Sequence, residues 1–346
     1  MTSFAGRRLR PMVTATAIAL LASTLVWVGI AAAGTSAAKS GPTAVLVSIQ
    51  PVNDKGVMQD FVSGFNAGAA KYGYSQHKVV ILSNASTYIP TLQQVAAHYN
   101  LVVTTFPPMI QAVDTVAPQF PKTDFVLLDA QTTKAHPNVQ TLFFKENESS
   151  FLAGVVAGMM TKTARVGFLG ALVQDVINRY LVGFQQGVKY VNPKVHVSWA
   201  YVNALEDPAL GKQFALQMYG KGIDIIHAAT AGTEVGVYEA SQQAKKFLIG
   251  ADVDIRPLDP QYGLTATGPD FSGAAKIIMQ QYATGKFLSG RHQYGLKDGA
   301  VRVLPFNTTL VPANVRAKVA AVEKLIVNGT IKVPTDTYLP HLKNGQ

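Results

Sequence analysis

The chain contains no cysteine among its 346 residues. This absence excludes disulfides, thiolate metal sites, a cysteine nucleophile and a lipid-modified N-terminal cysteine. Charged residues are also scarce, at 14% of the chain, and the longest basic run after the N-terminal region is Lys245-Lys246. The formal net charge of +10 is therefore spread thinly, which indicates a solvated basic surface and argues against a groove for nucleic acid.

Sequence motifs for catalysis and cofactor binding are missing as well. The candidate for a dinucleotide-binding turn, Gly167-Phe168-Leu169-Gly170, lacks the spacing of that motif, and no glycine-rich phosphate loop with a lysine occurs. The seven histidines are scattered without metal-ligand spacing, and no serine lies in a nucleophile elbow. We therefore expect no catalytic residue, no metal site and no cofactor. A Rossmann-type enzyme is the less favoured alternative.

The N-terminal region has the pattern of a targeting segment. Three arginines, the last of them Arg10, precede an apolar run at 12–33, and small residues follow. This order is typical of a secretory signal peptide, with cleavage after Ala33 or Ala37. About 20 apolar residues can also span a bilayer, so an uncleaved membrane anchor within 1–37 is the alternative. In either case we expect an exported protein, at the extracellular face of the membrane or in the periplasm.

The remaining chain alternates short apolar runs with helical patterns. Apolar runs of strand length form two series, at 44–49, 79–82, 101–106 and 125–128, and at 165–169, 195–202, 224–229 and 247–251. Such strands, alternating with helices, predict parallel sheets covered on both faces, and hence an α/β protein of two Rossmann-like lobes. The expected boundaries are lobe 1 at 44–145 and lobe 2 at 146–254, with segments from about 255–300 and 312–346 returning to the lobes.

A helix that ends near Lys162 links the two series. Its apolar residues recur as one stripe, whereas Gly154 and Gly158 lie with alanines on another face. Each glycine costs a helix about 1 kcal/mol, so these small residues predict that another backbone packs very close. We expect hinges where the chain passes between the lobes, near Lys145, at 251–255 and at 299–304.

In sheets of this kind a ligand lies beyond the carboxyl ends of the strands. The candidates for ligand contact are Asp54, Met58, Phe106 and Asp129 in lobe 1 and Asn178, Tyr180, Gly232, Thr233 and Asp252 in lobe 2. Some of them also have a structural interpretation. Asp129 and Asp252 fit as caps of the helices that follow, Asp54 as a loop residue, and Met58 and Phe106 as core.

Short motifs in the second half of the chain occur in an order that resembles one protein family. They are Ser150-Phe151-Leu152-Ala153-Gly154, Val166-Gly167-Phe168, Gly183-Phe184-Gln185-Gln186-Gly187-Val188, Asp207-Pro208-Ala209 and Ile249-Gly250-Ala251-Asp252-Val253-Asp254. The chain resembles the basic membrane protein (BMP) family of ABC-transporter substrate-binding proteins, over nearly everything from 44 to 328. The resemblance implies a type 1 periplasmic-binding fold with a hinge, and a cleft that holds a purine nucleoside for import.

Family roles transfer by position. The resemblance implies that Asp129 accepts hydrogen bonds from a base edge and that Asp252 accepts them from both ribose hydroxyls. The first-lobe loop of the family, Asp-Lys-Ser-Phe-Asn, reads Asp-Lys-Gly-Val-Met at 54–58, and no lysine occurs at 264–269. The stacking aromatic, the base-binding asparagine and the sugar-binding lysine are therefore absent. Stacking contributes about 1–3 kcal/mol per base, so a site without the aromatic residue would bind a nucleoside more weakly. The resemblance therefore does not identify the ligand.

The sequence thus predicts a monomeric extracytoplasmic receptor of an ABC importer. Its expected partners are a nucleoside-like small molecule and an ABC permease in the membrane. The alternative is a membrane-anchored sensor that passes the signal of the same ligand to a regulatory protein.

Overall fold

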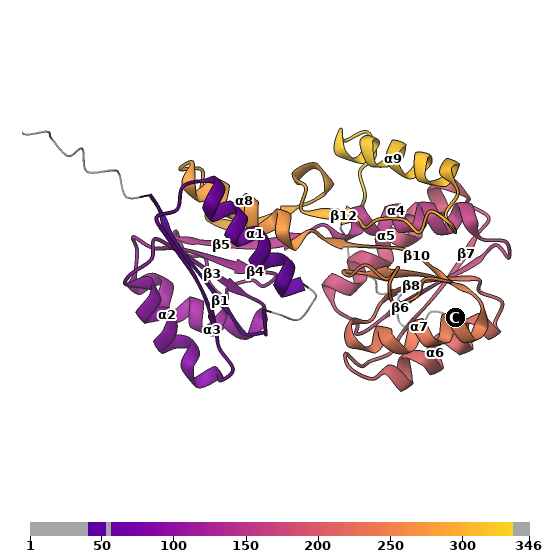
Figure 1. The fold of residues 1–346 in the computed structure, drawn as a ribbon, viewed down its shortest axis with the longest axis horizontal. Coiled ribbons are helices and arrows are strands. Elements are labelled where there is room, and N and C mark those ends of the chain that lie inside the picture. Colours follow the sequence, from indigo (N-terminus) through magenta and orange to yellow (C-terminus); the bar gives the residue numbers. More distant parts are fainter. Residues whose placement is uncertain (1–40, 53–56, 335–346) are drawn as a thin grey trace, which may run out of the picture. The chain divides into compact units, whose positions relative to one another are not determined.

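The computed structural model describes residues 41–52 and 57–334. The N-terminal targeting segment and Asp54 lie outside these ranges. Within them the chain forms two six-stranded sheets with helices on both faces of each (Figure 1). No helix in the described ranges is long and apolar enough to cross a membrane.

The first sheet is parallel throughout. Its strands are β1 (Thr43–Ser48), β2 (Gln76–Ile81), β3 (Leu101–Thr105), β4 (Asp124–Leu128), β5 (Val139–Phe144) and β11 (Gly290–Tyr294), in the order β11-β5-β4-β3-β1-β2. One face packs against α1 (Val57–Lys71) and α8 (Phe271–Ala283), and the other against α2 (Tyr88–Ala96) and α3 (Ile110–Val116). Because both faces are covered, its interior strands are mostly apolar.

The second sheet repeats this arrangement. Its strands are β6 (Arg165–Gly170), β7 (His196–Tyr201), β8 (Ile225–Ala229), β9 (Phe247–Ala251), β10 (Gly263–Pro269) and β12 (Val301–Val303), in the order β12-β10-β9-β8-β6-β7. Only β12 runs antiparallel among these described strands. One face packs against α4 (Glu146–Met160) and α5 (Asp175–Val191), and the other against α6 (Pro208–Gly220) and α7 (Glu234–Ala244). Helix α9 (Ala313–Val327) contacts α4.

Short 3₁₀ turns lie between these elements: η1 (Ala85–Thr87), η2 (Pro107–Met109), η3 (Ala117–Gln119), η4 (Ala231–Thr233) and η5 (Leu296–Asp298). In both sheets the strand order reverses beside the first strand, between β1 and β3 and between β6 and β8. Such reversal points open a crevice at the carboxyl ends of the strands. The predicted α/β architecture with two Rossmann-like sheets is confirmed.

Helices α4 and α5 pack with their backbones almost in contact. A Cβ atom added to Gly154 on α4 would lie 2.2 Å from the carbonyl oxygen of Phe184 on α5. A Cβ atom added to Gly187 on α5 would lie 1.9 Å from the carbonyl oxygen of Phe151 on α4. No real Cβ atom fits at these distances, so the glycines are what permits the approach. The close backbone predicted from the small residues of α4 is confirmed.

The eight predicted strand runs omit β5, β10, β11 and β12, and β5 shows why a strand can be missed. Strand β5 is fully buried between β4 and β11, although Gln140 and Thr141 interrupt its apolar run. Both polar side chains have partners in the structure. The Gln140 amide donates to the Tyr294 hydroxyl at 3.4 Å, and the Thr141 hydroxyl donates to the Gln131 side chain at 3.1 Å. Hydrogen-bond partners make polar residues tolerable inside a sheet, and the local sequence does not reveal one as distant as Tyr294.

The chain passes between the two sheets three times. It leaves the first sheet at Lys145, returns to it at Asp270 after β10, and leaves it again at 295–300. The hinge predicted at 251–255 is wrong, because β9 and β10 are paired strands of one sheet. The three passages are bonded to one another: Lys145 N–H donates to the Tyr294 carbonyl at 2.9 Å, and Asp270 N–H to the Ala300 carbonyl at 2.8 Å.

Candidate ligand-binding site

Unusual backbone conformations gather at the carboxyl ends of the strands. Seven described residues other than glycine have φ in the left-handed region. Five of them follow strands β3, β4, β7, β8 and β9 within two residues: Phe106, Asp129, Asn203, Ala231 and Asp252. Each such residue costs of order 1–3 kcal/mol, and strain of this kind is concentrated at functional sites. The strain therefore marks the edge at which the sequence predicts a ligand.

Asp252 follows β9, and a buried tyrosine holds its side chain. The Tyr180 hydroxyl on α5 donates to Oδ1 of Asp252 at 2.5 Å. The backbone N–H of Asp252 donates to the Thr267 carbonyl on β10 at 3.0 Å. Main chain and side chain of Asp252 are thus both held by the second sheet and its helices.

Asp129 follows β4 of the first sheet, and its backbone N–H donates to the Leu142 carbonyl on β5 at 2.7 Å. Burial raises the pKa of Asp129 to about 8, with further contributions from the carboxylates of Glu146 and Asp252 and an opposing one from Arg179. The charge of Asp252, at the end of a strand in the second sheet, therefore acts on Asp129, at the end of a strand in the first. Such a pair suits a ligand that donates hydrogen bonds to both.

A buried ion pair between Arg179 and Glu146 lies near Asp129 and Asp252. Nε of Arg179 on α5 donates to Oε2 of Glu146 at 2.6 Å, and its NH2 group donates to Oε1 at 3.3 Å. Both side chains are buried. Burial raises the pKa of Glu146, and the guanidinium of Arg179 opposes that shift. The guanidinium of Arg179 is thus hydrogen-bonded to Glu146, and its positive charge also lowers the pKa of Asp129.

Burial likewise raises the pKa of Asp252 to about 6, and the hydrogen bond from Tyr180 opposes this shift. Glu234 at the start of α7 adds another buried carboxyl, and Oε1 accepts from the Ala251 N–H at 3.3 Å. Burial and the charge of Asp252 raise the pKa of Glu234 well above its ordinary value. At neutral pH this site therefore retains protons that exposed carboxyl groups would lose.

A cavity of about 320 Å³ adjoins Asp252. Its walls come from the start of α1, the turn after β9, the start of α8 and strand β12, through Val57, Gln59, Asp60, Ser63, Asp252, Val253, Asp254, Phe271, Arg302 and Leu304. Arg302 on β12 spans it, with NH2 3.0 Å from Oδ2 of Asp60 and NH1 3.3 Å from Oδ1 of Asp270. The cavity has a volume typical of a small-molecule site.

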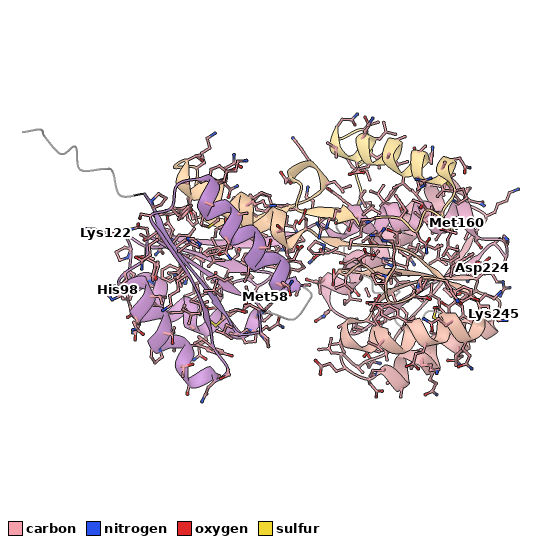
Figure 2. All side chains as sticks on the ribbon, in the orientation of Figure 1. Met58, His98, Lys122, Met160, Asp224 and Lys245 are labelled. Carbon is pink, nitrogen blue, oxygen red and sulfur yellow. The ribbon has the colours of Figure 1, made fainter. Side chains whose placement is uncertain are left out.

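The other predicted contact residues have different surroundings. Met58 on α1 (Figure 2) is fully buried in the hydrophobic core, and Phe106 packs partly buried against the same core cluster. Oδ1 of Asn178 accepts from the Tyr201 hydroxyl at 2.7 Å. The Thr233 hydroxyl accepts from the Asp207 N–H at 2.9 Å. These contacts give the four residues structural roles.

Gly232 is exposed in η4, beside Thr233. Of the predicted contact residues, Asp129, Tyr180 and Asp252 thus lie together, and Gly232 is open to solvent. The side chains of Met58, Phe106, Asn178 and Thr233 instead pack in the core or form hydrogen bonds within the protein.

Sequence reasoning missed three charged residues of this group: Glu146, Arg179 and Glu234. One signal was present, because Arg179 lies between Asn178 and Tyr180 at the start of a helix expected to face the cleft. Nothing local identifies its partner, since Glu146 is 33 residues away.

Within the described residues no cluster of histidine and acidic side chains could hold a metal ion.

Known proteins share both the sequence pattern and the fold. A family model described as ABC transporter substrate-binding protein PnrA-like (Bmp) matches residues 41–337. The CD4+ T-cell-stimulating antigen of Listeria monocytogenes is 34% identical over 259 residues, which are 69% of this chain and 71% of that protein. The ABC transporter nucleoside-binding protein BmpA of Lactococcus lactis is 32% identical over 242 residues, 65% of this chain and 68% of that protein.

Two solved structures are similar in fold. An ABC transporter solute-binding protein from Aeropyrum pernix K1 aligns with a TM-score of 0.67 at 21% identity, over 85% of this chain and 94% of its own. A transcriptional activator of the comK gene from Bacillus halodurans aligns with a TM-score of 0.72 at 22% identity, over 85% of this chain and all of its own.

The two repeated sheets and the three passages between them define the type 1 periplasmic-binding fold. More particularly, this chain belongs to the Bmp family of PnrA-like ABC transporter substrate-binding proteins. The resemblance seen in the sequence motifs is confirmed. The family consists of binding proteins for transport and not of enzymes.

Proposed function

We propose that this protein is the exported receptor of an ABC importer and binds a nucleoside or a related metabolite between its two lobes. The observation that carries the proposal is the convergence of Asp129 and Asp252 from the ends of two different sheets. A ligand that donates hydrogen bonds to both carboxyl groups joins the lobes. The closed form gains contacts that the open form lacks, so binding favours closure about the passages at Lys145, Asp270 and 295–300.

The chemistry of the two acceptors suits a nucleoside. Ribose hydroxyls and the N–H groups of a base are donors. The Asp252 carboxylate accepts them in strong hydrogen bonds, and the carbonyl oxygen of a protonated Asp129 is an acceptor as well. The curated relative from Lactococcus lactis is named for nucleoside binding, which supports the same class. In the described part of the chain, the two arginines near the carboxyl groups and the cavity already have acidic partners: Arg179 is paired with Glu146, and Arg302 with Asp60 and Asp270. We therefore infer a nucleoside in preference to a nucleotide.

The proposal includes a cellular location and a partner. The apolar segment at 12–33 directs the chain out of the cytoplasm. A receptor at that side of the membrane delivers its ligand to a permease, and we propose an ABC permease as the partner of the closed form.

Binding is tested by a thermal-shift screen of the purified chain against nucleosides, nucleobases, sugars and other small metabolites. A ligand at 100 times its dissociation constant adds about 2.7 kcal/mol to the free energy of unfolding, which moves the melting midpoint by several degrees. We expect guanosine, adenosine or inosine to raise the midpoint. A shift with a different class of compound alone would contradict the nucleoside assignment and retain the receptor.

The variant Asp252→Ala locates the site. We expect it to bind the same nucleoside at least tenfold more weakly in titration calorimetry, because a charged hydrogen bond contributes about 1.5–3 kcal/mol. Glu239→Gln is the matched control, since Glu239 is exposed on α7 and paired with Lys212. Equal affinity of Asp252→Ala and the wild type would remove Asp252 from the site.

A further inference from the structure

Tyr180 occupies a position from which it cannot serve as an open contact for a ligand. Its side chain is 2% exposed, and its hydroxyl proton is already directed to Oδ1 of Asp252 at 2.5 Å. We propose that Tyr180 is a positioning residue: it holds one oxygen of Asp252 and thereby sets the direction in which the other oxygen meets the ligand. This role rests on the proposed receptor function and replaces the direct contact expected from the sequence.

The structure reserves space for this hydrogen bond. A Cβ atom added to Gly268 on β10 would lie 2.4 Å from Oδ1 of Asp252 and 2.9 Å from the Tyr180 hydroxyl. A side chain at 268 would therefore push the two groups apart. Gly268 lies between β9 and β12 in the sheet, where glycine has no advantage for strand formation. Its absence of a side chain thus serves the Asp252–Tyr180 contact.

The backbone of Asp252 is held independently of its side chain. Its φ of 65° lies in the left-handed region, and its N–H is bound to Thr267. Because the main chain of Asp252 is fixed, its carboxylate can change direction only by rotation about the side-chain torsions. The Tyr180 hydroxyl restricts these torsions, so the carboxylate is oriented before the ligand arrives. Such preorganisation raises affinity because less freedom is lost on binding.

Tyr180 is itself held in place by α4 and the sheet. The Ser150 hydroxyl on α4 donates to the Tyr180 carbonyl at 2.6 Å. His227 on β8 lies with its ring centroid 5.9 Å from that of Tyr180, edge to face. Its Nε2 is 3.1 Å from the Ser150 hydroxyl, and its Nδ1 is 3.1 Å from the carbonyl of Ile249 on β9. Burial lowers the pKa of His227 to about 4, so this support stays neutral at physiological pH.

The charges around Asp252 make its protonation sensitive to Tyr180. Besides Tyr180, the charged or titratable groups that interact with it or line the adjoining cavity are Glu146, Asp129, Glu234, Tyr238, Asp254, Asp60 and Arg302. Burial and the negative charge of Glu146 raise the pKa of Asp252, whereas the hydroxyl of Tyr180 lowers it. Loss of that hydroxyl therefore leaves a larger fraction of Asp252 protonated near neutral pH, where it is a poorer acceptor.

The test is the variant Tyr180→Phe in the full-length chain, with Tyr219→Phe as the matched control. Tyr219 is equally buried in the same lobe, but its hydroxyl donates to the Phe247 carbonyl at 3.0 Å, remote from the carboxyl group of Asp252. The first measurement is a ¹³C-carboxyl NMR titration of the ligand-free proteins, with the Asp252 signal assigned through Asp252→Asn. We expect the titration midpoint of Asp252 to move to higher pH in Tyr180→Phe and to stay at the wild-type value in Tyr219→Phe.

The second measurement is guanosine affinity by calorimetry between pH 5.5 and 8.5. We expect Tyr180→Phe to bind about tenfold more weakly at pH 7 and to recover part of the loss at pH 8.5. A merely structural role would lower affinity equally at every pH. Gly268→Ala retains the hydroxyl but displaces it, and we expect the same pH-dependent loss.

An Asp252 titration in Tyr180→Phe identical to the wild type would overturn the positioning role. That result is independent of the ligand. Failure of the wild type to bind guanosine would count against the proposed nucleoside function instead, while the NMR titration still decides the role of Tyr180. Should Tyr180→Phe fail to fold, judged by its urea midpoint, the decision passes to Gly268→Ala, and an unchanged Asp252 titration there would overturn the proposal.

Discussion

Asp129 combines a left-handed backbone with a carboxyl group surrounded by other acids. Neither feature is favourable for folding. An unfolded aspartate has a pKa near 4, whereas burial and neighbouring carboxylates raise the pKa of Asp129 to about 8. The native state therefore keeps a proton that the unfolded chain has released. A residue that costs stability and faces the predicted crevice is more consistent with binding than with helix capping.

This difference predicts how stability depends on pH. A raised native pKa contributes stability that is full below pH 4 and is lost as the pH rises through 8. We expect the free energy of unfolding to fall between pH 5 and 8, and Asp129→Asn to reduce that slope by up to about 1 kcal/mol per pH unit. Urea denaturation at pH 5.5, 7 and 8 measures it, with Glu239→Gln as control. Equal slopes for Asp129→Asn and wild type would refute this account.

At the scale of elements, the contact of α4 and α5 positions the site. Glu146 lies at the start of α4, and Arg179 and Tyr180 lie near the start of α5. The glycines along both helices set the separation of the two axes, and with it the distance between these side chains. A change in this helix contact can therefore alter the geometry of the candidate site residues.

The variant Gly187→Ala tests this packing. Its new Cβ atom would lie 1.9 Å from the Phe151 carbonyl, so the helices must separate. We expect a loss of about 1–3 kcal/mol in the free energy of unfolding. Gly220→Ala at the end of α6 is the matched control, because nothing lies within 4 Å of its added Cβ atom. There we expect a gain of up to about 1 kcal/mol, from helix propensity. Equal midpoints for the two variants in urea would contradict the packing account.

At the scale of the whole molecule, the bonded passages between the sheets act as one joint. Besides the backbone bonds at Lys145 and Asp270, the carboxylate of Glu148 accepts from the Leu296 N–H at 2.8 Å. Passages that are hydrogen-bonded to one another move together. The expected motion is therefore a rotation of one lobe about this joint, without independent movement of single strands.

The absence of cysteine makes that motion measurable. Cysteines in place of Lys122 (Figure 2) and Lys221, both exposed and in different lobes, accept spin labels without competing sites. We expect the distance between the labels to change when a stabilising nucleoside saturates the protein. A control pair at Lys189 and Lys221 lies within the second lobe, and its distance should stay constant. An unchanged 122–221 distance in the saturated protein would contradict hinge closure.

Much of the fold could be predicted because it depends on local pattern. Apolar runs of strand length and the helices between them follow from the side chains of neighbouring residues, and parallel order follows from burial on both faces. The strand-end rule then selects Asp129 and Asp252. Strand β5 was missed for the converse reason, since the buried Gln140 finds its partners, Gln281 and Tyr294, in distant elements.

The sequence by itself determined the alternation of strands and helices, the family and the two aspartates. The tertiary structure alone decided the partner of Asp252 and the ion pair near both aspartates: Tyr180 is 72 residues from Asp252, and Arg179 is 33 residues from Glu146. It also decided that the chain passes between sheets at Asp270 and not at 251–255. The physical reason is that a periodic pattern reports burial, whereas a hydrogen bond between distant residues depends on the register and separation of whole elements.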